Sequence, residues 1–173
     1  MFYDKIEEIH WKYIKKTHAD IIGKIHAEAW MQAYEDLFPA EYLNQESAQK
    51  RKEEFLNNQH ESMQYYLLSE ENTYIGMFKI ILSNDICEIS SIYILEEYCH
   101  KGYGSKCMDY IKRNYSQCKI ILWTLEMNWE ARNFYEKHHF RDTGKRRIIY
   151  RGCPYIQVQY ALWDSCIYKM QIY

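Results

Sequence analysis

Two glycines lie close together in the middle of the chain, at Gly102 and Gly104, and the chain has only six in all. They follow a stretch rich in β-branched and apolar residues, 86–94, which predicts a buried strand. They precede residues 104–116, whose apolar positions recur at helical spacing. Free N–H groups at a helix N-terminus and the helix dipole both favour negative charge, so the loop predicts an anion site. Lys101 adds a positive charge beside it.

The glycine loop alone is equally compatible with a plain strand-to-helix turn. A P-loop requires G-x-x-x-x-G-K-[ST], which the sequence lacks. A dinucleotide-binding fingerprint requires a third glycine at the position that Cys107 occupies. Other parts of the chain must therefore decide between a turn and a phosphate site.

Two motifs of this sequence resemble those of the GNAT superfamily of acyl-CoA N-acyltransferases. Motif A of that family reads [QR]-x-x-G-x-[GA], and residues 99–104 read Cys-His-Lys-Gly-Tyr-Gly, with Cys99 in place of Gln or Arg. The second motif, N-x-x-A-x-x-F-Y, is matched by residues 128–135, and His139 replaces the glycine that follows it in the family. The resemblance extends over residues 14–162, nearly the whole chain.

The order of the expected elements indicates an α+β fold, because consecutive antiparallel strands are followed by strand–helix alternation. The resemblance implies a GNAT-type mixed, mostly antiparallel central sheet of about seven strands, flanked by helices and splayed at the cofactor strand. We expect one domain over residues 1–163 and an apolar C-terminal tail at 164–173. Strands are expected at 10–16, 63–69, 73–82, 86–94, 119–125, 140–150 and 155–162. Thr17 and Ser47 are expected to cap helices, and the charge run 50–54 is expected to face solvent.

Acyl transfer from a thioester requires that acetyl-CoA be held and that its carbonyl be polarised. The resemblance implies that the glycine loop holds the pyrophosphate, and that the backbone N–H of Ile94 polarises the carbonyl. Cys99 removes one side-chain contact to the phosphates but leaves the backbone contacts in place. The expected cofactor-binding residues are Ile92, Tyr93, Ile94, Cys99, His100, Lys101, Gly102, Tyr103, Gly104, Ser105, Asn128 and Asn133.

Two residues are the expected catalytic groups. Tyr135 occupies the position of the family's general acid, which protonates the departing thiolate; the alternative is a structural tyrosine beside Phe134. Glu88 lies six residues before Ile94, at the spacing of the catalytic glutamate in histone-type members, and burial on a strand would raise its pKa. The alternatives are a glutamate paired with a lysine, or a water chain ending at Glu28, Glu35 or Tyr34.

The acceptor amine is expected to bind against the first helix. The run Ala29–Tyr34, with its Trp-x-x-Ala-Tyr pattern, resembles a GNAT subgroup in which this helix lines the acceptor cleft. We therefore expect Trp30, Tyr34 and Glu28 to contribute to that cleft, although both aromatics also suit an ordinary core. A mildly acidic rim would suit a cationic amine; it consists of Glu28, Glu35, Asp36 and Glu41. A small amine, polyamine-like or other, and a peptide amine both remain open as acceptors.

Composition narrows the remaining function classes. The formal net charge of −2 provides no basic footprint for nucleic acid. The six cysteines are scattered without a C-x-x-C pair, which favours reduced thiols over disulfides or a metal site. No apolar run approaches a membrane span and the early residues are acidic, so we expect a cytoplasmic protein. The main alternative is a non-catalytic acyl-CoA-binding or regulatory module on the same fold, and the sheet edges and apolar tail are compatible with a homodimer.

Overall fold

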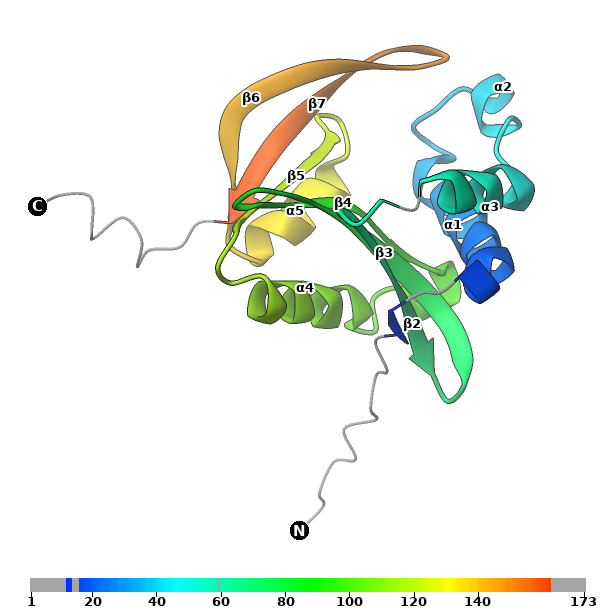
Figure 1. Ribbon diagram of the computed structural model, residues 1–173. Helices are drawn as coiled ribbons and strands as arrows, with labels where there is room; N and C mark the ends of the chain where they lie inside the picture. Colours follow the sequence, from blue (N-terminus) through cyan, green and yellow to red (C-terminus); the bar gives the residue numbers. More distant parts are fainter. Residues whose placement is uncertain (1–11, 14–15, 59, 163–173) are drawn as a thin grey trace, which may run out of the picture.

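A seven-stranded sheet with the order β1-β2-β3-β4-β5-β7-β6 forms the centre of the protein (Figure 1). The computed structural model describes residues 12–13, 16–58 and 60–162. Neighbouring strands are antiparallel except for β4 and β5, which are parallel, so the predicted mixed α+β sheet is confirmed. The strands are β1 Lys12–Tyr13, β2 Met63–Glu70, β3 Thr73–Ser83, β4 Ile86–Ile94, β5 Lys119–Leu125, β6 Phe140–Arg151 and β7 Cys153–Leu162.

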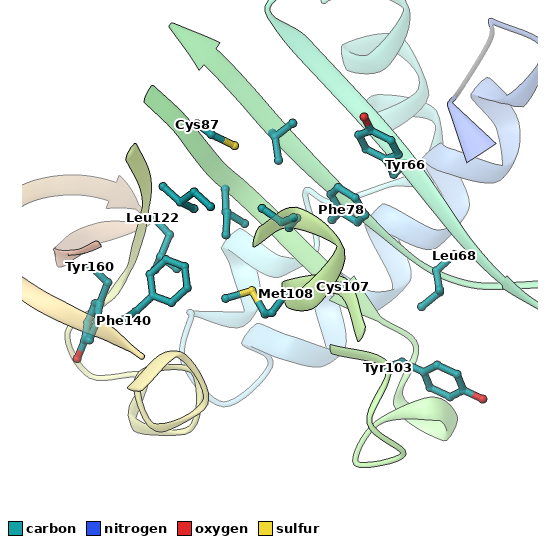
Figure 2. Packing of buried hydrophobic residues seen from close by; sticks show 14 of the residues in the cluster. Tyr66, Leu68, Phe78, Cys87, Tyr103, Cys107, Met108, Leu122, Phe140 and Tyr160 are labelled. Carbon is teal, nitrogen blue, oxygen red and sulfur yellow. The ribbon is translucent and has the colours of Figure 1, made fainter. Parts of the chain in front are cut away.

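Helices cover both faces of the sheet (Figure 1). The helices are α1 Ala19–Tyr34, α2 Ala40–Leu43, α3 Ala48–Asn57, α4 Tyr103–Asn114 and α5 Trp129–Lys137, with 3-10 turns η1 Lys16–His18 and η2 Glu96–Tyr98. On one face, Ile22 and Ile25 of α1 pack with Phe55 of α3 against the sheet. On the other face, Figure 2 shows Cys107 and Met108 of α4 among sheet side chains. Two apolar cores therefore hold the sheet between helical layers.

The sheet divides between β4 and β5. These strands pair from Ile86 with Lys119 to Ile89 with Leu122, and the rest of β4 pairs only with β3 in the described structure. On its other edge β5 pairs with β7 through residues 121–125, so residues 123–125 have β7 but not β4 as a neighbouring strand. The predicted splay is thus present, and it leaves one edge of the C-terminal half of β4 without a neighbouring strand.

The expected cap at Thr17 is wrong. Residues 16–18 form a 3-10 turn, α1 begins at Ala19, and its N-cap is His18, whose side chain makes no cap bond. Asp20, the expected partner in a capping box, instead binds Lys52 Nζ of α3 at 2.6 Å. The other expected cap is confirmed, because Ser47 Oγ accepts a hydrogen bond from the Lys50 N–H at 3.1 Å.

The sequence predicted that the charge run of α3 faces solvent, and this is wrong for Arg51. Arg51 is half-buried, donates through Nε to Glu46 at 2.8 Å and through Nη1 to Glu54 at 2.7 Å, and lies over the Trp30 ring. Packing of α3 against α1 turns this guanidinium inward, and two carboxylates offset its desolvation. The expected first strand is described only at residues 12–13, and the tail 164–173 lies outside the described residues.

Candidate active site

The open edge of β4 exposes backbone groups of Ile92 and Ile94. The Leu95 N–H donates to the Ile75 carbonyl at 2.9 Å, which places Leu95 in a hydrogen-bonded pair with β3. Residues of an antiparallel ladder alternate, so Ile94 and Ile92 direct their N–H and C=O groups away from β3. The Cys99 thiol supports this orientation because it donates to the Ile94 carbonyl, with 3.6 Å between sulfur and oxygen. The gap in the sheet is therefore lined by main-chain donors and acceptors.

The N-terminus of α4 opens toward the same gap. Gly102 is its N-cap with φ +85°, and His100 also has a positive φ of 59°. The first helical bond runs from the Lys106 N–H to the Gly102 carbonyl at 3.1 Å, so residues 103–105 have N–H groups without helical partners. A Cβ on Gly102 would meet no atom within 4 Å, which shows that the loop is open on this side. An anion can approach these donors directly.

The second glycine serves helix packing. A Cβ on Gly104 would lie 3.2 Å from two atoms of the Phe134 ring, tighter than ordinary contacts. Gly104 thus allows α5 to pack closely against the first turn of α4. The same packing places His138 Nε2 3.0 Å from Ser105 Oγ.

These elements surround one cleft of about 960 Å³, a size typical of ligand sites. Most of the predicted cofactor residues line it, namely Ile92, Tyr93, Ile94, Cys99, His100, Gly102, Gly104, Ser105, Asn128 and Asn133, together with Tyr135. Lys101 and Tyr103 do not. The Lys101 ammonium lies over the Tyr98 ring, and the Tyr103 side chain is buried with its hydroxyl bonded to Glu70.

Sequence reasoning missed several residues of the cleft. From α1 they are Ala29, Gln32 and Ala33; from η2 and α5 they include Glu96, Tyr98, Glu130, Phe134, Lys137 and His138. Gln32 Oε1 accepts a hydrogen bond from the Glu96 N–H at 3.1 Å and so joins α1 to the loop after β4. No local motif marks this contact, because it joins residues 64 positions apart. For Lys137 and His138, their place at the end of the second motif was the available signal.

Helix α5 carries Tyr135 into the cleft. Asn128 caps the helix by accepting a hydrogen bond from the Ala131 N–H at 3.0 Å. The helix ends at Lys137 with His138 as its C-cap, and His139 adopts φ +68°. The histidine thus takes the left-handed conformation that favours glycine, and the replacement leaves that turn conformation in place.

Three tyrosines from different elements interact beside the gap: Tyr34 of α1, Tyr93 of β4 and Tyr135 of α5. The side chains of Tyr34 and Tyr93 are hydrogen-bonded to each other. Burial raises the pKa of Tyr135 well above its ordinary value, and the neighbouring Tyr34 raises it further. Tyr135 therefore keeps its proton at neutral pH.

Glu88 and the predicted acceptor residues lie outside this cleft. Glu88 belongs to the part of β4 that is paired with β5, and it interacts electrostatically with Lys79 and Arg147. Trp30 is 6% exposed and packs with Phe38 and Leu125 as a core residue.

The two other acceptor residues differ in their surroundings. Tyr34 does not line the cleft itself, but its side chain is hydrogen-bonded to Tyr93, which does. Glu28 is half-buried on α1 and does not line the cleft, whereas the neighbouring Ala29 does.

Every described helix is too short or too polar to cross a membrane. In the same part of the chain, no group of three or more His, Cys, Asp or Glu residues is arranged to hold a metal ion.

Comparisons with known proteins agree with this geometry. Streptothricin acetyltransferase A from Bacillus subtilis is 34% identical over 95 residues, which are 52% of this chain and 53% of that enzyme. The chain thus spans about half the length of this curated relative. The PaiA N-acetyltransferase from Thermoplasma acidophilum, crystallised with coenzyme A, has the same fold, with a TM-score of 0.70 and 19% identity over 88% of this chain and 98% of that one.

The spermidine/spermine N-acetyltransferase SpeG from Vibrio cholerae also shares the fold, with a TM-score of 0.66 and 16% identity over 94% of this chain and 97% of that one. The model of the acetyltransferase (GNAT) family matches residues 27–140, which include β4, the glycine loop and α5. The chain therefore belongs to the GNAT acetyltransferase family.

Proposed function

We propose that this protein is an N-acetyltransferase that moves an acetyl group from acetyl-CoA to a primary amine by direct attack. The observation that carries the proposal is the convergence of three features in one cleft. These are the free backbone edge of β4 at Ile92 and Ile94, the open N-terminus of α4 at Gly102, and the protonated Tyr135. A simple strand-to-helix turn at Gly102 would require neither the free edge of β4 nor a tyrosine in the cleft.

The residues present fit acetyl-CoA. The N–H groups of residues 103–105 suit a pyrophosphate, since they lack helical partners and lie at the positive end of a helix dipole. Lys137 adds a cation to the cleft and Asn133 adds an amide. The N–H and C=O groups of Ile92 and the N–H of Ile94, which face the open edge of β4, suit the amide-containing pantetheine arm.

The chemistry then divides among the protein's own groups. Acetyl-CoA, when bound, supplies a thioester carbonyl that gains negative charge as the amine adds and a sulfur that leaves as thiolate. The Ile94 N–H is the donor for the developing oxyanion. Tyr135 gives its proton to the thiolate as the C–S bond breaks and the C–N bond forms, and it recovers a proton from solvent.

The amine must lose a proton before or during the attack, because an ammonium group has no free electron pair. Glu88 stays the predicted base, but its separation from the cleft requires intervening water to carry the proton. The alternative is a water chain that ends at another residue. The two routes can be distinguished, because replacing Glu88 would leave the rate of acetyl transfer unchanged if the chain ends elsewhere.

The second candidate is a non-catalytic acyl-CoA-binding module, and Cys99 at the usual Gln or Arg position favours it. The Cys99 thiol points to the Ile94 carbonyl, and burial and nearby glutamates raise its pKa, so it contributes no positive charge. Retention of Tyr135 in a position that keeps its proton favours the enzyme instead.

A thiol-release assay with product identification by mass spectrometry tests the two candidates. The protein is supplied with acetyl-CoA and, separately, with polyamines, amino acids, aminoglycosides, streptothricin and peptides. An acetylated amine formed in step with free CoA supports the enzyme. Calorimetric binding of acetyl-CoA without turnover of any acceptor would support the binding module.

The remaining expectations belong to this proposal. We propose one catalytic domain over residues 1–163, acting in the cytoplasm on a small amine or a peptide amine. The scattered cysteines and the absence of a C-x-x-C pair support a reducing compartment. A homodimer stays a prediction, which analytical ultracentrifugation would test.

A further inference from the structure

The β6–β7 hairpin extends beyond the sheet and docks on the α1–α2 connection (Figure 1). The Tyr155 hydroxyl donates to the Leu37 carbonyl at 3.0 Å, and a Cβ on Gly152 would lie 3.4 Å from the Pro39 ring. The hairpin therefore faces the same helix that carries Tyr34. This face of the hairpin is distinct from the acyl-CoA cleft described above.

Side chains on this inner face follow the strand alternation. Arg147 pairs with Gln157, Ile149 with Tyr155 and Arg151 with Cys153, so the three β6 residues share one face. Ile149 and Tyr155 pack against the cluster of Trp30 and Phe38, which identifies this face as the one turned toward α1. Arg147 and Arg151 therefore project on the face of the hairpin that is turned toward α1.

Both guanidiniums are held in place by neutral groups. Arg147 lies 4.3 Å from the centre of the Trp123 ring and donates through Nε to Gln157 Oε1 at 2.7 Å. Arg151 lies 5.9 Å from the centre of the Tyr42 ring and donates through Nη1 to the Tyr150 carbonyl at 2.9 Å. Within the described ranges, neither forms an ion pair with a carboxylate. Stacking and neutral hydrogen bonds orient the two cations and leave further N–H donors for a ligand.

Arg146 provides the contrast. It is the neighbour of Arg147, lies on the opposite face of β6, and pairs with Asp142 at 2.8 Å and Glu126 at 3.2 Å. The hairpin thus neutralises its outer arginine, whereas its two inner arginines have no ion-paired carboxylate among the described residues.

The two arginines lie within electrostatic range of groups near the proposed reaction site. Arg147 interacts with Arg151 and with Glu88, and Arg151 interacts with Tyr34. Tyr34 in turn interacts with Tyr135, the proposed acid. A ligand anion at the arginines would lie on the side of the hairpin that packs against α1, the helix that also lines the cleft through Ala29, Gln32 and Ala33.

We propose that Arg147 and Arg151 bind an anionic group of the acceptor, so that the substrate is an amine that also carries a carboxylate or phosphate. A guanidinium presents paired N–H donors that match either anion. This inference rests on the proposed N-acetyltransferase function and names its substrate class. It narrows the open choice among amine acceptors, since the acidic residues of the first helices by themselves would suit a cationic amine without an acid group.

Matched acceptors that differ only in the anionic group provide the test. Thiol release is measured with lysine against cadaverine, tyrosine against tyramine, and O-phosphoethanolamine against ethanolamine, at saturating acetyl-CoA. We expect at least one acid-bearing member to have a kcat/KM ten or more times that of its partner. The first two pairs test whether the site prefers a carboxylate on the acceptor, and the third pair tests whether it prefers a phosphate.

Variants then assign the preference to the two arginines. We expect Arg147→Gln and Arg151→Gln each to raise KM for the acid-bearing acceptor about tenfold and to leave its neutral partner unchanged. Arg147→Lys should recover part of the loss, and Arg146→Gln should change neither acceptor.

Two results would overturn the assignment, and they can be told apart. Equal or better use of the neutral partners, or equal effects of the variants on both, would reject the anionic acceptor while leaving the acetyltransferase intact. Absence of thiol release with every acceptor, despite acetyl-CoA binding, would reject the proposed function itself.

Discussion

The N–H of Leu95 donates to the carbonyl of Ile75 at 2.9 Å, and this bond fixes which residues of β4 face the gap in the sheet. Leu95 is turned toward β3, so Ile94 is turned away from it. The proposed oxyanion donor is consequently a backbone group whose direction is set by the strand pairing. The neighbouring residue Leu95 provides a matched control, because its N–H faces β3 and not the gap.

Replacing Ile94 by proline removes the proposed donor without removing a bond between β3 and β4. We expect Ile94→Pro to lower kcat by roughly 10²–10³-fold, the usual effect of losing one oxyanion donor. Ile94→Val, which keeps the N–H, should retain most of the activity in the thiol-release assay.

Leu95→Pro is the stability control for that experiment. It removes the bond to Ile75, so it should lower the urea midpoint by more than Ile94→Pro does. If Ile94→Pro is fully active, the N–H of Ile94 has no role in catalysis.

Tyr135→Phe keeps the aromatic ring and removes only the proton donor. We expect kcat to fall by about 10²-fold while acetyl-CoA affinity, measured by calorimetry, changes little. Tyr110→Phe, on α4 away from the cleft, is the control.

The pH profile of the wild type gives an independent test of the same residue. Burial raises the pKa of Tyr135, so the protonated form that can donate persists to higher pH than for an ordinary tyrosine. The value of kcat should therefore show no descending limb below about pH 10. A descending limb near pH 8 that disappears in Tyr135→Phe would contradict the assignment.

His26 makes folding stability depend on pH. It is buried against Tyr93, and burial followed by Arg51 and Lys79 lowers its pKa from 6.5 to about 3. The unfolded chain binds the proton more strongly, so the contribution is fully present above pH 6.5 and is lost as the pH falls toward 3. Between pH 7 and pH 5 the free energy of unfolding should fall by about 2 kcal/mol from this residue.

Urea unfolding of His26→Gln between pH 7 and pH 5 measures that contribution. The variant should be less stable at pH 7 but have a flatter pH dependence than the wild type. His60→Gln, at an exposed histidine, should keep the wild-type slope. An unchanged slope in His26→Gln would show that this imidazole is not the responsible group.

His139 carries a conformational cost that glycine would remove. Its φ of 68° lies in the left-handed region, where a Cβ is unfavourable by roughly 1 kcal/mol. We expect His139→Gly to raise the free energy of unfolding by about 0.5–1 kcal/mol. His139→Ala should not, and a destabilised His139→Gly would mean that the imidazole contributes a contact of its own.

Strand positions could be predicted because local pattern determines them. The limits of β4 and β5 agree with the sequence prediction, since each is a continuous β-branched and apolar run between clear turn signals. The start of α1 was missed because the Asp20 carboxylate binds Lys52 of another helix, which no local motif reveals.

The site was predictable where backbone conformation depends on residue type. Gly102 has the positive φ that its residue type favours, and Asn128 caps α5 as asparagine commonly does. The environment of Arg147 depends instead on Trp123 and Gln157, which come from two other strands. Side-chain partners across a sheet follow from register, and the sequence alone does not specify register over such separations.

Calorimetric titration of acetyl-CoA against Gly102→Ala and Gly144→Ala tests the central claim most directly. Both glycines have positive φ, at +85° and +81°, and a Cβ on either meets no atom within 4 Å. Both variants should therefore lose about 1 kcal/mol of stability for the same reason.

Of these two glycines, only Gly102 lines the cleft. If the N-terminus of α4 holds the acyl donor, Gly102→Ala will weaken acetyl-CoA binding by at least about tenfold, and Gly144→Ala will bind as the wild type does. Equal affinities of the two variants, or no binding by the wild type, would contradict the account of this cleft as an acetyl-CoA site.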